Sequence, residues 1–359
     1  MSDIHGIRWV DTTGAVNAFK NVDGQPRFVA QEYYQQIGEG NITGHSSWSK
    51  IGYTPTMTTT ESDIWSLAGT YVFPTAAMGM EVTSAGTNAA NDVGTVIHSG
   101  TSNGGSAVTL TSTGENFLTT TIAGDYVIIE QSGTTPEWGV ITSIESNTQI
   151  SFAAGLSSGG TGSGRTYSII DTSATTGAQA VRFTYLDGSY NEKTEIVILN
   201  GTGVVATVNT NIFRINSFRV IAAGTGNAAA GNLSLRHIDN SPTYSYITAL
   251  FTRARNIQYT VPYGKTLYIN RINASFGYSG TQNNNYARMY TRANVDNITG
   301  FKLGNLFIPY TEMIISNSTS AIDLPIPTKL IATTDIKVSG IATVAGVAFV
   351  ALRGWLETA

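Results

Sequence analysis

Residues 261–276 (VPYGKTLYINRINASF) alternate with the two-residue period of a β-strand. A proline–glycine turn at 262–264 opens the run, and successive side chains after it should point to opposite faces of a sheet. We expect one face to hold Leu267, Ile269, Arg271 and Asn273, and the other to hold Tyr268, Asn270, Ile272 and Ala274. The expected partner is the distant run 325–338 (PIPTKLIATTDIKV). A strand that starts at a fixed turn and pairs with a distant segment predicts an antiparallel sandwich.

The composition of the chain favours strands and turns. Only 12% of the 359 residues are charged, against about 25% in an average soluble domain. The chain has 38 glycines, and 41% of its residues are hydrophobic, which supplies material for real cores and argues against disorder. We therefore predict an all-β protein, built from antiparallel β-sandwich (jelly-roll-like) domains with an inserted small β-barrel.

Turn signals divide the chain into four predicted parts. Two Asx–Gly pairs, Asp187-Gly188 and Asn200-Gly201, lie between alternating runs and predict hairpins. A short helix is expected at 31–37, where it stops at a glycine; the residues before it form either an extended arm or a simple strand pair. The predicted parts are an N-terminal arm with this helix (1–40), a first β-sandwich domain (41–93 plus 169–239), an inserted small β-barrel (94–168) and a C-terminal β-sandwich (240–359).

The inserted segment 94–168 has its own pattern of short runs separated by turns. Glycine-rich joints at 100–105 and 159–164 are suited to the two ends of an insertion. Closely spaced short strands of this kind are typical of a small barrel. The expected strands are 107–110, 124–129, 138–144, 148–152 and 165–170.

Several function classes are disfavoured by composition. The formal net charge is −4, without the clustered Lys and Arg of a nucleic-acid binder, and there are no cysteines for disulfides or thiolate chemistry. No secretion signal is visible at the start of the sequence. The longest apolar run, 341–352, is too short to span a bilayer, so we expect no membrane insertion.

Catalytic and metal-binding patterns are also missing from the sequence. The histidines His5, His45, His98 and His237 stand alone, without a second ligand at metal-binding spacing. No nucleophile elbow or phosphate-binding loop is present. We expect no catalytic residue, no metal and no cofactor. A glycan depolymerase remains a third hypothesis, because paired carboxylates meet only in space; its candidates are Glu61, Asp63, Glu192 and Glu195, which are expected more often as turn and strand-surface charges.

Aromatic side chains near the C-terminal arginines suggest a ligand site. Tyr278, Tyr286, Arg288 and Tyr290 could stack on host sugars, which makes a receptor-binding adhesin for host surface glycans the second hypothesis. The only basic concentration in the chain is formed by Arg253, Arg255, Arg271, Arg288 and Arg292. This group could make ion pairs between subunits, or it could bind a glycan or an acidic surface.

The order of several motifs resembles virion structural proteins of tailed bacteriophages. These motifs are 44–52 (GHSSWSKIG), 63–65 (DIW), 71–76 (YVFPTA), 186–195 (LDGSYNEKTE), 199–201 (LNG) and 213–218 (FRINSF). The C-terminal pattern is similar to β-sandwich heads of phage head and tail proteins, through 259–268 (YTVPYGKTLY), 325–327 (PIP) and 334–338 (TDIKV).

The resemblance implies a non-enzymatic virion component. We expect a capsid decoration protein or a head-fibre, tail-fibre or spike component, which is assembled in the host cytoplasm and could take part in host attachment. The charge-poor composition suggests that copies of the chain cover one another, so a homo-oligomer, a trimer in the first instance, is expected. Its other expected partners are the major capsid protein or other virion proteins.

Overall fold

The computed structural model describes residues 19–20, 26–27, 33–130, 136–153, 163–279, 285–296, 299–316 and 318–358. The chain forms two compact units, Met1–Ser47 and Trp48–Ala359. In the first unit, strand β1 (Phe19–Lys20) pairs antiparallel with β2 (Pro26–Arg27), and helix α1 spans Tyr33–Gly38. The helix predicted at 31–37 is therefore present, although its first two residues lie outside the described part. Most of the predicted arm at 1–30 also lies outside the described residues.

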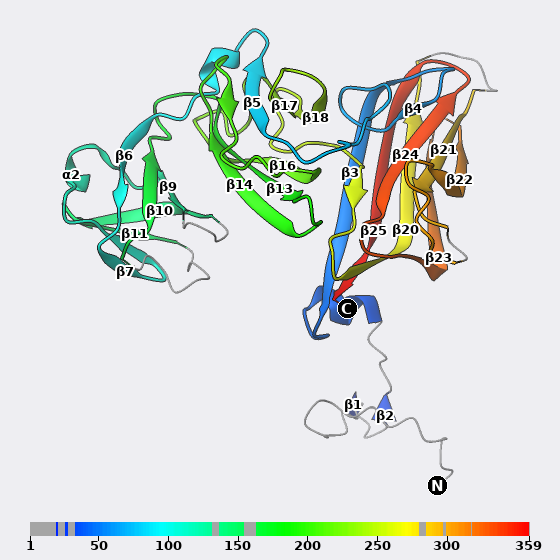
Figure 1. Cartoon of the computed structure of the whole chain (residues 1–359), viewed down its shortest axis with the longest axis horizontal. Coiled ribbons are helices and arrows are strands. Elements are labelled where there is room, and N and C mark those ends of the chain that lie inside the picture. The colour runs from blue at the N-terminus through cyan, green and yellow to red at the C-terminus, as the bar shows by residue number, and fades with distance from the viewer. Residues whose placement is uncertain are drawn as a thin grey trace. The chain divides into compact units, whose positions relative to one another are not determined.

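Two antiparallel sheets, built mostly from the C-terminal half of the second unit, share one hydrophobic core (Figure 1). One sheet has the order β23-β20-β25-β3, and the other has the order β19-β24-β21-β22 with β4 beside β24. Their strands are β3 (His45–Met57), β4 (Ser62–Asp63), β19 (Tyr259–Thr260), β20 (Lys265–Gly277), β21 (Ala287–Ala293), β22 (Ile308–Ile315), β23 (Ser318–Leu330), β24 (Asp335–Ala342) and β25 (Gly346–Thr358).

A second pair of antiparallel sheets is formed by strands that lie between β4 and β19 in the chain. Their orders are β14-β13-β16 and β15-β5-β17-β18, and Phe183, Phe218 and Leu233 lie in the core between them. The hairpin predicted at Asp187-Gly188 is present, with Leu186 opposite Glu192. The strands are β5 (Met80–Ala85), β13 (Ala178–Leu186), β14 (Glu192–Ile198), β15 (Val205–Ala206), β16 (Arg214–Ala223), β17 (Asn232–His237) and β18 (Thr243–Ile247).

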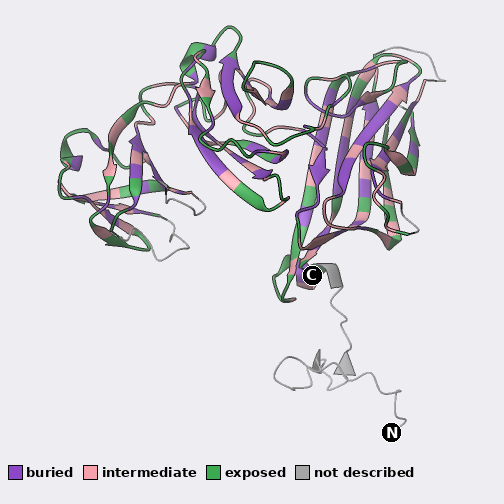
Figure 2. Ribbon diagram, in the orientation of Figure 1, coloured by how far each residue is buried: buried purple, intermediate pink, exposed green. Residues whose placement is uncertain are grey.

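The inserted segment forms one seven-stranded antiparallel sheet around its own core. Its strands carry buried residues, drawn in purple (Figure 2). The sheet order is β6-β12-β9-β10-β11-β8-β7, and its two end strands follow each other directly in the sequence. The five predicted strands correspond to β8 to β12, whereas β6, β7 and the short helix were not predicted. The elements are β6 (Val96–Thr101), β7 (Gly104–Ser106), β8 (Thr109–Thr111), α2 (Phe117–Thr120), β9 (Tyr126–Glu130), β10 (Glu137–Ser146), β11 (Gln149–Phe152) and β12 (Thr166–Ile170).

The prediction of an all-β protein with antiparallel sheets is confirmed, but the strands are grouped differently from the predicted parts. Strands β3 and β4 come from 41–93 yet belong to the C-terminal sheets, where β4 pairs with β24. Strand β18 lies after residue 240 yet pairs with β17 in the preceding sheets. The predicted partner run 325–338 is split, because 325–330 pairs with β20 in β23 while Asp335 starts β24 in the opposite sheet.

Asp92 fixes the place where the chain enters the inserted sheet. Its carboxylate is fully buried and follows the 3₁₀ helix η1 (Ala89–Asn91). It accepts hydrogen bonds from Ala178 N (2.7 Å), Ala230 N (2.8 Å), Gly231 N (2.7 Å) and Ser84 Oγ (2.6 Å). Four donors compensate the desolvation of this buried charge. The carboxylate therefore holds the residue before the insertion next to the residue after it.

A β-bulge at Asn270 changes the alternation predicted for 261–276. Leu267 and Ile269 share one face as expected, and this face is buried, but Ile272 and Ala274 are buried on the same side, not on the opposite one. The register against β25 shifts between Ile269 and Arg271, so that one extra residue is inserted in β20. The predicted two-face assignment is wrong beyond this point, because the extra residue returns the following side chains to the core.

Gly354 lies opposite the bulge, where a side chain has no room. A Cβ atom there would collide with the backbone oxygen of Tyr268. We expect Gly354→Ala to lower the free energy of unfolding by about 1–3 kcal/mol, because the two strands would have to separate. Urea unfolding measures this change. Gly277→Ala is the matched control, since a Cβ there meets nothing within 4 Å; equal losses in both variants would contradict the explanation.

Candidate functional site

A pocket of about 430 Å³ opens in the second unit beside strands β3, β13 and β16. The segment 253–258 and the start of β19 complete its wall. Its volume lies in the range of small-molecule sites, about 300–1,000 Å³. The pocket was not predicted from the sequence, because its walls come from segments that are far apart in the chain.

Three arginines lie side by side on one wall of this pocket, and we call them the arginine row. Arg182 on β13 is directly opposite Arg219 on β16, and Arg219 forms an isolated antiparallel bridge with Arg253. Residues that are opposite each other in adjacent strands present their side chains on the same face. Within the part of the chain that the structure describes, none of the three arginines has an ion-pair partner within 4.0 Å.

Like charges directly opposite each other destabilise a sheet, so the arginine row lowers the stability of this sheet. Trp138 from β10 offsets part of it, because the guanidinium carbons of Arg182 and Arg219 lie 4.8 Å and 5.5 Å from its ring centroid. Burial, together with the charge of Arg219, lowers the pKa of Arg182, while Glu192 acts in the opposite direction. An anion in the pocket would relieve this repulsion.

Lys50 on β3 adds a fourth basic group to the pocket. Its Nζ donates a hydrogen bond to the backbone oxygen of Asn256 (3.2 Å) and lies 6.0 Å from the ring centroid of Tyr259. Burial lowers the pKa of this amine to about 7. The amine is therefore poised between its charged and neutral forms near neutral pH, and a nearby anion would favour the charged form.

Uncharged polar groups line the rest of the pocket. Thr184 lies opposite Ser217, two residues along each strand from Arg182 and Arg219, and both hydroxyl residues line the cavity. Asn256 and Gln258 also line it, and among the described residues the side-chain oxygens Asn256 Oδ1 and Gln258 Oε1 have no hydrogen-bond partner. The pocket thus combines cations with hydroxyl groups, whereas the two amide oxygens are buried from solvent.

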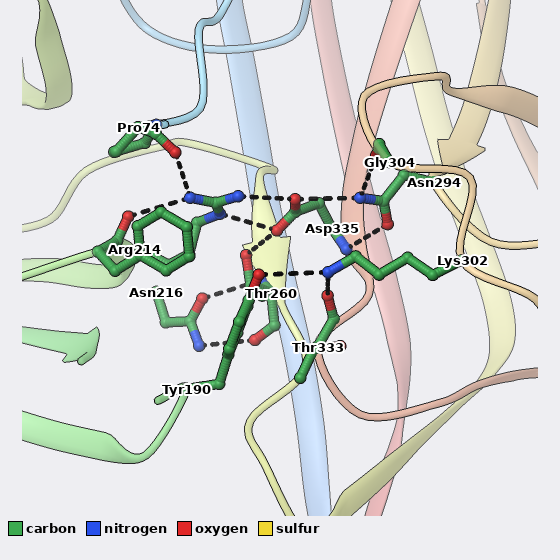
Figure 3. Close-up of polar contacts among 11 residues, drawn as sticks. Pro74, Tyr190, Arg214, Asn216, Thr260, Asn294, Lys302, Gly304, Thr333 and Asp335 are labelled. Atoms are coloured by element: carbon green, nitrogen blue, oxygen red, sulfur yellow. Dashed lines mark hydrogen bonds and ion pairs between the residues drawn. The ribbon is translucent and has the colours of Figure 1, made fainter. Parts of the chain in front are cut away.

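A buried ion pair next to this pocket fixes the strand that carries Arg219 (Figure 3). Arg214 Nε and Nη2 donate to Asp335 Oδ1 and Oδ2 at 2.9 Å and 3.0 Å, and Arg214 Nη1 donates to the backbone oxygen of Pro74. Asp335 also accepts from Thr260 Oγ1 (2.6 Å) and Asn294 Nδ2 (3.1 Å). The pair joins β16 to β24, and its charges are satisfied by the surrounding donors.

Two further contacts continue this junction (Figure 3). Asn216, two residues after Arg214, exchanges two hydrogen bonds of 2.9 Å with the backbone of Thr260. Lys302 Nζ donates to Thr333 O (2.6 Å) and to the Tyr190 hydroxyl (3.2 Å). Strand β16 is therefore held at Arg214 and Asn216, just before it contributes Ser217 and Arg219 to the pocket.

The four residues predicted from the sequence as a ligand site lie elsewhere, on the C-terminal sheets. Tyr278 is half-buried and packs on the core, with its ring 5.8 Å from that of Phe276. Tyr286 lies just before β21 and donates its backbone N–H to Thr343 Oγ1 (3.0 Å). Arg288 and Tyr290 follow on the outer face of β21, so the structure brings these two together on the surface while Tyr278 belongs to the core.

The charges around Arg288 and Tyr290 are compensated, unlike those of the arginine row. Arg288 forms an ion pair with Glu312 (3.7 Å), and the Tyr290 hydroxyl and Glu312 together raise the pKa of the guanidinium. Arg292 lies 4.8 Å from the Tyr290 ring centroid and forms an ion pair with Glu61 (2.8 Å). This face carries aromatic and basic groups as predicted, but its cations already have partners.

Among the four carboxylates considered for a glycan depolymerase, Asp63 and Glu195 make structural contacts. Asp63 is buried, pairs with Lys337 (3.1 Å) and accepts from Tyr71 N (2.7 Å); burial raises its pKa. Glu195 was predicted as a surface charge but is buried, and it accepts hydrogen bonds from Val208 N and Asn209 N. Of the four candidate carboxylates, only Glu192 lines the pocket.

One histidine has partners that the sequence did not indicate. His98 Nδ1 lies 2.6 Å from Glu115 Oε2, and its Nε2 lies 2.7 Å from Thr120 Oγ1. In the described ranges no group of three or more His, Asp or Glu side chains is arranged to hold a metal ion. The helices of those ranges are also too short or too polar to cross a membrane.

No protein-family model matches this chain, and no curated protein matches it. The defining property of the pocket is a group of cations beside hydroxyl groups, with no ion pair to its arginines among the described residues, which suits a ligand that has both negative charge and hydrogen-bonding groups.

The lowered pKa of Lys50 predicts a pH-dependent stability. Between about pH 7 and the ordinary lysine value of 10.5 the unfolded chain binds more protons than the folded one, so the free energy of unfolding should rise with pH. The slope is at most about 1.4 kcal/mol per pH unit. Urea unfolding from pH 7 to 10 measures it. Lys50→Met should lose this slope, whereas Lys329→Met, which removes an exposed lysine, should keep it; identical slopes in the two variants would refute the assignment.

The buried pair predicts a large effect for a single substitution. Arg214→Met leaves Asp335 buried without its cation and should cost about 3–5 kcal/mol of unfolding free energy. The control is Arg271→Met, which removes an exposed pair with Asp323 (3.4 Å) and should cost no more than about 1 kcal/mol. Denaturant unfolding compares the two variants. A loss in Arg214→Met as small as that of the control would show that this pair does not hold the junction.

Proposed function

We propose that this protein is a non-enzymatic structural component of a tailed-bacteriophage virion, and that its C-terminal sheets form a jelly roll. The observation that carries the proposal is the strand order. Counted along the chain as β3, β19, β20, β21, β22, β23, β24 and β25, without the two-residue β4 that pairs with β24, the first sheet has the order 1-8-3-6 and the second has the order 2-7-4-5. This is the order of a double Greek key jelly roll, an architecture used by viral capsid and lectin domains.

Assembly into a homo-oligomer is part of the proposal. The chain has few charges, and several large apolar side chains are strongly exposed, among them Ile326 (87%), Val208 (86%) and Leu250 (81%). Such a surface is suited to coverage by further copies or by other virion proteins. We propose a homotrimer on the capsid or in a spike or fibre, with the major capsid protein or another virion protein as its neighbour.

A receptor-binding adhesin is the second candidate. The pocket beside the arginine row favours it, because a concave site with cations, hydroxyls and amides is suited to a polar ligand. The contacts of Asp63 and Glu195 give no support to a glycan depolymerase, which needs a pair of carboxylates facing a substrate.

The virion role predicts where the protein is found. Mass spectrometry of density-purified particles encoded by the same genome should detect it in many copies per particle, and light scattering of the purified protein should give a multiple of 38.1 kDa. A cryo-EM map of the particle would then contain the two pairs of sheets. A monomeric protein that is absent from purified particles would refute the proposal.

A further inference from the structure

We propose that the pocket beside the arginine row binds an acidic saccharide, with a carboxylate of the sugar on the guanidinium groups. The proposal goes beyond the virion role and does not depend on it. If it holds, it also gives the second candidate function a ligand class and a site.

The first step is charge. The arginine row and Lys50 place four basic side chains around one cavity, and Glu192 is the acidic residue among those lining it. Arg182 and Arg219 face each other in register, and neither has an ion-pair partner among the described residues; Arg182 is half-buried, and the charge of Arg219 lowers its pKa further. A carboxylate is the complementary partner, since the planar guanidinium fork binds two carboxylate oxygens at once.

The second step is the uncharged part of the site. The hydroxyl groups that line the cavity can both donate and accept hydrogen bonds. A simple inorganic anion can only accept them, whereas sugar hydroxyls donate as well as accept. The hydroxyls of Thr184 and Ser217 lie in the position next to the arginines, where they can contact the same sugar ring.

The third step is shape. The cations gather in one cavity of about 430 Å³ and do not form an extended basic stripe, and the chain has a net charge of −4. Nucleic-acid binding surfaces show the opposite pattern, with many cations spread along a face. A compact acidic sugar therefore fits the site better than a phosphate backbone.

The ligand class is tested with paired probes. An array of oligosaccharides bearing glucuronate, galacturonate or sialate is compared with the methyl esters of the same compounds, and the best pair is then measured by isothermal titration calorimetry. We expect at least one carboxylated glycan to bind about tenfold or more tightly than its ester. The proposal is overturned if no carboxylated glycan exceeds its ester, or if inorganic sulfate or single-stranded DNA competes as well as the glycan.

The site is tested by substitution in the full chain. Arg219→Ala should weaken binding of the same glycan about tenfold or more, and Arg219→Lys should recover part of the loss because it keeps the charge without the fork. Arg271→Ala makes the same change of charge on β20, at a position that does not line the pocket, and should leave the affinity unchanged. Thermal unfolding checks that each variant is folded. Equal affinities in Arg219→Ala and the parent protein would overturn the site.

Discussion

The buried ion pair between Arg214 and Asp335 is the interaction on which the arrangement of the second unit depends. Each partner comes from a different pair of sheets, so neither can be desolvated without the other. Such a pair gives little net stability but strongly disfavours arrangements that separate its charges. Because β16 continues from Arg214 to Arg219, the geometry of the pocket is set by the same pair.

Several of the few charges of this chain are used in such contacts. Arg165 with Glu137 and Arg236 with Glu81 are further buried or half-buried pairs, and Glu195 and Asp92 accept several hydrogen bonds each. In a protein with so few ionisable residues, a row of arginines without ion pairs is therefore unusual. The arginine row lies beside Trp138, whose ring face attracts cations, in a cavity that an anion can enter.

Local patterns in the sequence predicted the positions of the strands well, but they predicted poorly which strands pair with each other. The hairpin at Asp187-Gly188 could be predicted because its turn lies in one short loop, 187–191, between two alternating runs. The bulge at Asn270 could not, because it exists only in the register against β25. The arginine row could not be predicted either, since Arg182, Arg219 and Arg253 lie on three separate segments and only their pairing brings them together. Of these three arginines, only Arg253 belongs to the basic group identified from the sequence.

The carboxylate of Asp92 has a consequence for how this protein can evolve. It binds the backbone of Ala178 directly, so the chain leaves for the inserted sheet and returns from it at nearly the same point. The same two attachment points could accept a module of different sequence, provided that it replaces the apolar contacts that Ile128 and Ile170 make with Ala180, Ile196 and Ala222. The inserted sheet is in this sense an exchangeable cassette, whereas the strand that carries Arg219 belongs to the permanent frame.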